Sequence, residues 1–285
     1  MLIAEKTKIE EWIFMKPTIA FVIAITCGSL NYLSAAEPIA IAHRGLLRHA
    51  PENTHAAFAA CLELRMGFEL DIRTTSDGHL VVIHDDNLVR TTNGPSKSIR
   101  NITLAEAKEL DAGSWFDAAY ANERIPTFEE TCELIKNRKH GPTVIALNIK
   151  DINLDGERKL IELLDKYAMF EYSFAFDQSE EVSKRLKALD QRLRIGQNVN
   201  RGSIKQVLEK NLIDVFLLSD TPTKAEVETL HASGKQVLFN YAGSGPQRRN
   251  TQAWRQAYDA GIDGMLTDYP TMALEVWREV RKSDD

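Results

Sequence analysis

The stretch "PIAIAHRGLLRHAPENTHAAFAACLELRMGFELDIR", residues 38–73, contains the pattern that decides the fold. A short apolar run at 38–43 is followed by an alanine-rich run at 54–66 and a second short apolar run at 68–73. Short apolar runs predict buried strands, whereas apolar residues spaced three and four apart predict a helix. We therefore expect strand, helix and strand, with Gly67 as the C-terminal cap of the helix.

The same alternation continues to the end of the chain. Further strand-like runs lie at 143–150, 172–176, 193–197, 214–219, 236–241 and 263–268, and helical patterns lie between them. Eight strands alternating with helices predict a parallel (β/α)8 barrel of the TIM type, with the helices outside. No linker divides the chain, so we expect a single domain from residue 37 to residue 285.

One connection is much longer than the others. Residues 73–142 separate the second and third strands and include "HLVVIHDD", an extra strand or hairpin after the Asp77-Gly78 turn. Helical segments are expected near 103–110 and 127–137. A long loop on a barrel is usually functional, so we expect this insertion to border a site.

The composition limits the classes of partner. Of the 285 residues, 44% are hydrophobic and 27% are charged, and the formal net charge is -6 with no long block of like charge. This argues against an extended nucleic-acid surface, which needs a basic stripe. It permits a small anionic substrate, because a few cationic groups suffice to hold one.

The N-terminus has the features of an export signal. An apolar run follows Lys16, and Ser34 and Ala36 stand at the small-residue positions before a cleavage site. We expect residues 1–36 to be a signal peptide, with Met15 as an alternative start, and the protein to be periplasmic or secreted. The run is too short for a stable membrane span, although an uncleaved anchor is the competing interpretation.

Two cysteines remain after the expected cleavage. Cys61 and Cys132 each lie in a helical pattern among apolar neighbours. An exported pair can form a disulfide, and two buried thiols fit the pattern equally well.

Glu69 and Asp71 are the first candidate site residues. Their spacing puts both carboxylates on one face of a strand, opposite Phe68, Leu70 and Ile72. On an isolated strand this would be a solvated polar face. In a barrel the apolar face must meet the helices, so the carboxylates point inward or to the rim. Two confined carboxylates repel unless a proton or a cation joins them, and oxygen ligands suit Ca²⁺ or Mg²⁺.

Two histidines follow apolar strands. His43 ends the first strand, and His84 ends the extra strand of the insertion. A lone histidine at a strand end is commonly structural. A pair beside two carboxylates can accept and donate protons near neutral pH, as phosphodiester cleavage requires.

Cationic and amide side chains complete the candidate set. Arg44 and Lys150 can hold phosphate oxygens, and a surface salt bridge is the alternative for Arg44. Asn148 shares a strand face with Lys150 and can offer its amide oxygen to the cation, or it can be a hydrogen-bonded core residue. In "PENT", residues 51–54, we expect Asn53 or Thr54 to cap the helix and leave Glu52 open as a site residue.

At this point the sequence resembles the glycerophosphodiester phosphodiesterase family. The resemblance covers nearly the whole expected mature chain in order. It rests on "AHRG" (42–45), "PENT" (51–54), "ELD" (69–71), "TSDGHLVVIHDDNLVRTTNG" (75–94), "LDAGSWF" (110–116), "RIPTFEE" (124–130) and "GIDGMLTDYP" (261–270).

The resemblance implies a barrel enzyme that hydrolyses glycerophosphodiesters to glycerol phosphate and an alcohol. It implies His43 and His84 as the acid-base pair, and Arg44 and Lys150 beside the phosphate. It also implies Glu69 and Asp71 as ligands of a divalent cation. Two features depart from the family pattern. Asn148 stands where an acidic residue is usual, which removes one negative charge, and "NY" at 240–241 replaces Trp-Thr in a region expected to line the substrate pocket.

Two alternatives remain at this stage. The substrate can be another phosphodiester: a lysophospholipid, a phosphatidylinositol or a sugar phosphodiester, and an apolar rim near Trp115 and Phe116 would favour a lipid. The chain can also be a non-catalytic barrel that binds a ligand. Retention of both histidines and both carboxylates argues against the second alternative.

Overall fold

The computed structural model describes residues 37–243 and 245–284. The predicted signal peptide, residues 1–36, and the alternative start at Met15 lie outside the described residues. The prediction of export therefore remains a prediction.

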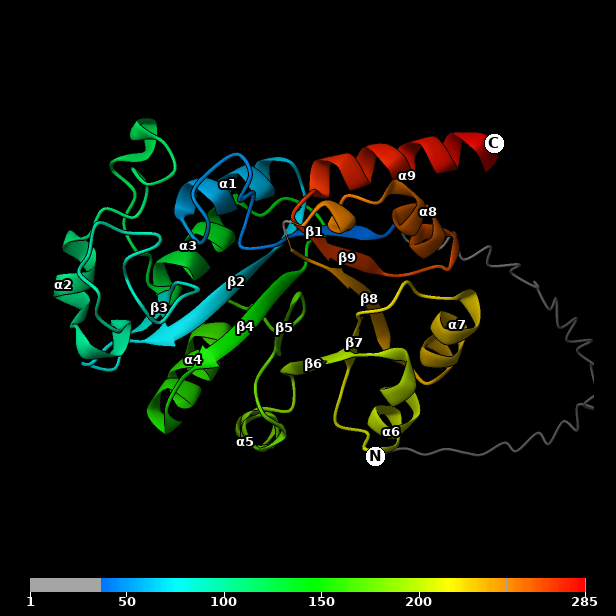
Figure 1. Cartoon of the computed structure of the whole chain (residues 1–285). Coiled ribbons are helices and arrows are strands. Elements are labelled where there is room, and N and C mark those ends of the chain that lie inside the picture. The colour runs from blue at the N-terminus through cyan, green and yellow to red at the C-terminus, as the bar shows by residue number, and fades with distance from the viewer. Residues whose placement is uncertain (1–36, 244, 285) are drawn as a thin grey trace, which may run out of the picture. The chain divides into compact units, whose positions relative to one another are not determined.

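Eight parallel strands close into a barrel (Figure 1). The closure is made by the first strand, which pairs with both the second and the last. The barrel strands are β1 (Ile39–Ala42), β2 (Gly67–Thr74), β4 (Ile145–Asp151), β5 (Ser173–Phe176), β6 (Arg194–Val199), β7 (Val215–Leu218), β8 (Gln236–Tyr241) and β9 (Gly264–Thr267). The (β/α)8 prediction is confirmed.

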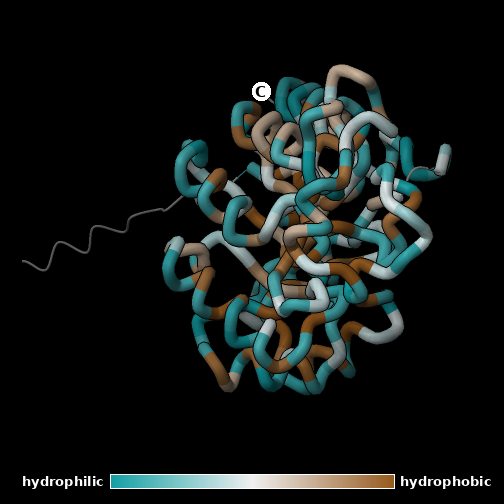
Figure 2. The backbone as a smooth tube through the Cα atoms, turned by 90° about the vertical axis from the view of Figure 1, so that its left-hand side faces the viewer, coloured by the Kyte–Doolittle hydropathy of each residue, from teal (hydrophilic) through white to brown (hydrophobic). Residues whose placement is uncertain are grey.

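Helices surround the strands. They are α1 (His55–Glu63), α2 (Leu104–Glu109), α3 (Phe128–Arg138), α4 (Leu154–Lys166), α5 (Glu180–Leu189), α6 (Ile204–Glu209), α7 (Lys224–Ala232), α8 (Thr251–Asp259) and α9 (Pro270–Asp284). Short 3₁₀ helices lie at Ile99–Asn101, Ala118–Tyr120, Arg201–Ser203 and Pro246–Arg248. Hydrophobic stretches run through the middle of this unit, and hydrophilic stretches follow many of the outer loops (Figure 2).

Alternation along the strands produces two apolar layers. Residues such as Phe68, Leu70 and Ile72 belong to the larger cluster beneath the helices. A smaller cluster fills the barrel with side chains from the opposite strand faces, among them Ile41, Val144, Ala146, Phe174, Phe176, Val215, Leu217, Leu238 and Leu266. Because Glu69 and Asp71 alternate with the outer set, they point into the barrel, where both are fully buried.

The insertion between β2 and β4 has its own small core. Its strand β3 (Leu80–Val82) pairs antiparallel with β2, and Val81 and Leu88 are among the residues of a separate buried cluster. Helices α2 and α3 begin at capping boxes on Thr103 and Thr127, close to the predicted positions. This packing fixes the loop that follows β3.

The predicted role of Gly67 is wrong. Helix α1 ends at Glu63, and Arg65 adopts the left-handed conformation (φ 55°) that the turn requires. Gly67 is instead the first residue of β2, where a Cβ atom would lie 2.5 Å from the carbonyl oxygen of Val144. Close approach of neighbouring strands, and not helix capping, explains this glycine.

The two cysteines are free and buried. Cys61 lies on α1 and Cys132 on α3, and burial raises the pKa of both thiols. Of the two alternatives that the sequence left open, the structure has the pair of thiols. Within the described part of the chain, no helix is long and apolar enough to cross a membrane.

Candidate active site

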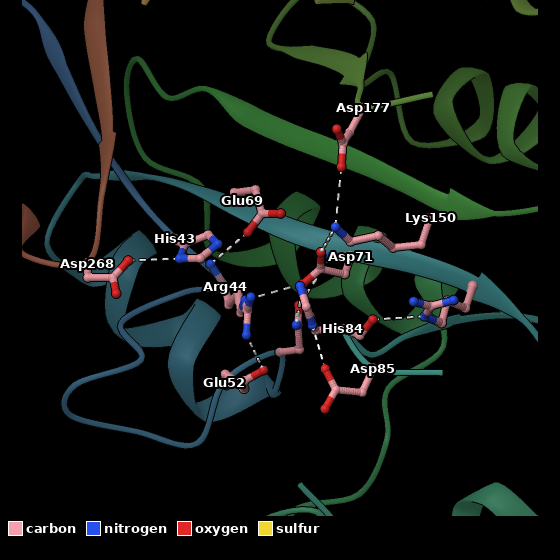
Figure 3. Close-up of polar contacts among 12 residues, drawn as sticks. His43, Arg44, Glu52, Glu69, Asp71, His84, Asp85, Lys150, Asp177 and Asp268 are labelled. Atoms are coloured by element: carbon pink, nitrogen blue, oxygen red, sulfur yellow. Dashed lines mark hydrogen bonds and ion pairs between the residues drawn. The ribbon is translucent and has the colours of Figure 1, made fainter. Parts of the chain in front are cut away.

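Six of the seven predicted site residues lie close together in Figure 3, and the seventh, Asn148, is the cross-strand neighbour of Asp71. They come from the carboxyl ends of the first three barrel strands and from the loop after β3, where active sites of this fold lie. The set comprises His43, Arg44, Glu69, Asp71, His84, Asn148 and Lys150.

Three buried oxygen atoms among these residues have no hydrogen-bond partner. They are Oε1 of Glu69, Oδ1 of Asp71 and Oδ1 of Asn148. Asp71 and Asn148 are direct cross-strand neighbours, and Glu69 precedes Asp71 by two positions on the same face. Unsatisfied buried oxygens are costly, and a hard divalent cation is the partner that two carboxylates and an amide suit.

The remaining atoms of the two carboxylates are held by the chain. The backbone nitrogen of Arg44 donates to Oε2 of Glu69 (2.8 Å). The side chain of Asn53 donates to Oδ2 of Asp71 (2.7 Å), and the backbone nitrogen of Asp71 donates back to Asn53 Oδ1 (3.2 Å). Burial first, and the charge of Asp71 second, raise the pKa of Glu69 to about 7. Both carboxylates are thus oriented before any ligand binds.

Thr54 alone is the N-cap of α1, and its hydroxyl accepts from the backbone nitrogen of Ala57 (3.4 Å). The capping role that the sequence suggested for Asn53 is therefore wrong. Asn53 adopts a left-handed conformation (φ 57°), which turns its amide toward Asp71.

Each histidine is bonded to a carboxylate through its Nδ1 atom. His43 Nδ1 lies 2.8 Å from Oδ1 of Asp268, the first residue after β9. His84 Nδ1 lies 2.6 Å from Oδ1 of Asp85. A carboxylate only accepts, so each Nδ1 carries the proton and each Nε2 is left for another partner.

The pKa values of the two histidines are displaced in opposite directions. Burial alone would lower the pKa of His43, but the hydrogen bond with Asp268 and the charge of Glu69 raise it above its ordinary value. Burial lowers the pKa of His84, and its charged neighbours do not offset the change. A pair displaced in this way can supply one proton donor and one acceptor.

Arg44 and Lys150 are not ordinary surface ion pairs. Arg44 Nη1 donates to Glu52 Oε1 (2.9 Å), and its Nε lies 3.8 Å from Asp71 Oδ2. Lys150 Nζ lies 3.5 Å from Asp71 Oδ1 and 3.4 Å from Asp177 Oδ2. Both cationic groups are largely buried beside Asp71, where they can also contact an anionic substrate.

The sequence interpretation missed Asp268 and Asp85 as partners of the histidines. Asp268 directly follows the last strand, so the strand-end rule that selected His43 also applied to it. Asp85 is adjacent to His84 in the chain, but its contact depends on a side-chain rotation that no sequence pattern reports. Glu52, which had been left open, lies at the edge of the site against Arg44.

The region around Asn240 lies at the same end of the barrel. Asn240, near the end of β8, donates from Nδ2 to Asn198 Oδ1 on β6 (2.6 Å), and Tyr241 donates to the carbonyl of Gln247 (2.7 Å).

Among residues 37–243 and 245–284, no three His, Cys, Asp or Glu side chains come together as a metal cluster. Any cation here would depend on the amide of Asn148 as the third ligand.

The model of the glycerophosphoryl diester phosphodiesterase family matches residues 43–272. The chain belongs to this family. A glycerophosphodiester phosphodiesterase of Caldanaerobacter subterraneus is 31% identical over 245 residues, which cover 85% of this chain and 98% of the relative. A Bacillus subtilis enzyme of the same name is 36% identical, with 86% and 88% of the two chains covered.

Solved structures agree with this assignment. A phosphodiesterase from Oleispira antarctica, in complex with the product sn-glycerol-3-phosphate, has a TM-score of 0.72 at 28% identity, covering 84% of this chain and 96% of that one. A glycerophosphodiester phosphodiesterase from Agrobacterium tumefaciens shares the fold, with a TM-score of 0.70 at 24% identity, covering 85% of this chain and 99% of that one. The chain is a phosphoric diester hydrolase, which removes the non-catalytic barrel from consideration.

Proposed function

We propose that the protein hydrolyses glycerophosphodiesters to glycerol phosphate and an alcohol, with the help of a divalent cation. The observation that carries this proposal is that buried oxygens of Glu69, Asp71 and Asn148 have no hydrogen-bond partner. Two histidines and two cationic side chains surround Glu69 and Asp71 (Figure 3). A structural relative holds sn-glycerol-3-phosphate as its product.

The cation would be held by Glu69, Asp71 and Asn148, and Ca²⁺ or Mg²⁺ suits these oxygen donors. When bound, it would act as a Lewis acid toward the phosphoryl oxygens. The amide of Asn148 makes the site less negative by one charge than three carboxylates would. Arg44 and Lys150 would orient the phosphate and neutralise charge that gathers on it in the transition state.

The two histidines would divide the proton transfers. His84, whose pKa is lowered, is neutral near pH 7 and would accept the proton of the attacking group. That group is either water or a hydroxyl of the glycerol; in the second case water would then open the cyclic phosphate to glycerol phosphate. His43, whose pKa is raised, would donate a proton from Nε2 to the leaving alcohol. Asp268 and Asp85 would each hold a ring by its protonated Nδ1, so that Nε2 faces the reacting groups.

A lysophospholipid is the second candidate substrate. Trp115, a residue of the insertion, is 40% exposed and packs edge-to-face on Phe116. An exposed aromatic at this position offers an apolar contact for an acyl chain. Phosphatidylinositol and sugar phosphodiesters remain further alternatives within the same chemistry.

Release of glycerol phosphate from glycerophosphocholine tests the proposal. The protein would be assayed with Ca²⁺, with Mg²⁺ and with a chelator, beside a His43→Ala variant and a matched lysophosphatidylcholine assay. Cation-dependent release that the variant abolishes is the expected result. Release of acylglycerol phosphate from the lysophospholipid, with no glycerol phosphate from glycerophosphocholine, would establish the second candidate. Release that persists in chelator would contradict the role of the cation.

We also propose that the protein is exported and acts after removal of residues 1–36. The support is the apolar run after Lys16 and the small residues Ser34 and Ala36. Sequencing the N-terminus of the protein recovered outside the cytoplasm should give Glu37 first. Recovery of an intact N-terminus in a membrane fraction would favour the uncleaved anchor.

A further inference from the structure

Arg90 lies beside the predicted site and bonds two carboxylates at once. Toward Asp85, its Nε donates to Oδ2 (2.5 Å) and its Nη2 to Oδ1 (3.0 Å). Toward Glu52, its Nη1 donates to Oε2 (2.8 Å) and its Nη2 to Oε1 (2.8 Å). Each carboxylate therefore accepts hydrogen bonds at both of its oxygens from one planar guanidinium group.

Both carboxylates also bond a residue of the site. Asp85 Oδ1 contacts Nδ1 of His84 (2.6 Å), and Glu52 Oε1 accepts from Arg44 (2.9 Å). Hydrogen bonds from Arg90 hold the pKa of Asp85 well below its ordinary range, so Asp85 stays an acceptor. Arg90 is thus one residue removed from both the second histidine and the arginine at the phosphate position.

The loop that carries Arg90 is held in place by burial and by hydrogen bonds. Leu88 is fully buried in the core of the insertion, and its backbone nitrogen donates to the carbonyl of Lys97 (3.1 Å). The hydroxyl of Thr92 donates to the carbonyl of Leu88 (2.6 Å) and closes the turn around Arg90. Although the Arg90 side chain is 43% exposed, its backbone has a defined place.

The orientation of the His84 ring depends on this arrangement. Arg73 fixes the backbone by donating to the carbonyl of His84 (2.9 Å), but it does not contact the ring. Within the described residues, Asp85 is the hydrogen-bond partner of the ring, and Asp85 is partly exposed and free to rotate unless Arg90 holds it. A carboxylate in this place selects the tautomer with the proton on Nδ1 and leaves Nε2 unprotonated.

We propose that Arg90 is a positioning residue that sets the tautomer and orientation of His84 through Asp85. The inference rests on the proposed function only in the use that it gives to Nε2 of His84. Loss of Arg90 would leave Asp85 able to turn toward solvent and would release the His84 ring. Arg44 would be affected less, because Glu52 would still accept from it.

The tautomer can be measured without any substrate. In the full-length protein labelled with ¹⁵N, the two ring nitrogens of His84 would be observed by NMR and assigned by their loss in His84→Gln. We expect the proton on Nδ1 in the parent protein and a mixture of tautomers in Arg90→Ala. An unchanged tautomer in Arg90→Ala would overturn the proposal, whatever the substrate proves to be.

Kinetics provide the second test. In Arg90→Ala, kcat should fall by about 10²-fold with a smaller change in KM, the effect expected when a reacting group is displaced by about 1 Å. Added guanidinium ion, at concentrations that do not unfold the protein, should restore part of the rate. Arg90→Lys should restore little of the lost kcat, because an ammonium group cannot hydrogen-bond two carboxylates in one plane.

Arg192→Ala is the matched control. Arg192 also bonds two carboxylates, Asp190 and Asp165, but belongs to the segment between α5 and β6 and contacts no predicted site residue. Its variant should keep the parent kcat. Equal losses in the two variants, or a loss in Arg90→Ala that follows its melting temperature and resists guanidinium, would show a merely structural role. If the parent protein released no glycerol phosphate, the proposed function would fail, and the NMR result would still decide the role of Arg90.

Discussion

Each of the two histidines of the site is bonded to a carboxylate, but the charged groups around the two rings differ. His43 lies at the end of a barrel strand, and the carboxylate that holds it belongs to the first residue after the neighbouring strand β9. His84 lies in the insertion, and its carboxylate is the next residue in the chain. Their side chains are 17% and 29% exposed, yet their pKa values move in opposite directions.

The difference shows that proton affinity is set by the whole charge environment. Burial opposes the charged form of both rings. For His43, Asp268 and Glu69 outweigh burial. For His84, the positive charges of Arg44 and Lys150 help burial to prevail over the nearby carboxylates. The same residue type therefore suits opposite roles on the two sides of one site.

Removal of either ring should have the largest effect. His43→Ala and His84→Ala should each lower kcat by about 10²- to 10⁴-fold with a glycerophosphodiester of an ordinary alcohol, because each removes one proton transfer. An activated aryl ester of glycerol phosphate separates the roles, since its leaving group needs no proton. Measured by aryl alcohol release, His43→Ala should recover most of its rate, and His84→Ala should not.

The opposite pattern would exchange the acid and the base. Equal recovery of the two variants would show that neither ring has a single role, and the contrast drawn from their pKa values would fail.

Substitution of Asp268 and substitution of Asp85 should change the pH dependence of the rate in different ways. The reactive form has neutral His84 and protonated His43. The acidic limb of the parent rate should therefore lie below the ordinary histidine pKa, and the alkaline limb should lie above it. Asp268→Asn removes a group that raises the pKa of His43, so the alkaline limb should move to lower pH and the profile should narrow. Asp85→Asn lowers the pKa of His84 further, so the acidic limb should move down and the profile should widen.

Both substitutions should also lower kcat, by about 10²-fold, because each frees a ring whose position matters to within about 1 Å. Profiles of kcat/KM against pH for the parent and the two variants measure the effect. A shift of the same limb in both variants would contradict the separate roles.

A smaller effect is expected from substitution of Asn148, one of the proposed cation ligands. Asn148→Glu adds a carboxylate beside Asp71, and we expect it to tighten cation binding by about tenfold, since ligand charge tunes the affinity of oxygen sites. Asn148→Ala should weaken binding, because it removes one of the three oxygens that have no hydrogen-bond partner. Calorimetric titration with Ca²⁺ and Mg²⁺ checks both variants independently of activity. Equal affinities in all three proteins would exclude Asn148 as a ligand.

The smallest effect is expected from modification of the two cysteines. Cys61 and Cys132 are buried thiols with raised pKa values, so a thiol reagent should label neither in the folded protein and should leave kcat unchanged. Labelling would be followed by mass spectrometry, with unfolded protein as the positive control. Rapid labelling of the folded protein would show that α1 or α3 opens readily.

Patterns along the sequence were enough to predict the barrel, and they selected seven candidate site residues that the fold brings close together. Alternating short apolar runs and amphipathic runs predicted each strand, because burial of one strand face imposes a period of two. The same rule placed Glu69 and Asp71 inside and His43 and His84 at strand ends. These predictions depend on local periodicity, which a sequence displays directly.

The partners of these residues became known from the three-dimensional arrangement of the chain. Asp268 reaches His43 because closure of the barrel brings the last strand beside the first, 225 positions away. Asn53 donates to Asp71 and does not cap the helix, because a left-handed turn directs its side chain toward the carboxylate. Gly67 proved to be a point of close strand approach. Such contacts depend on register and on side-chain rotation in three dimensions, and these have no signature in the order of residues along the chain.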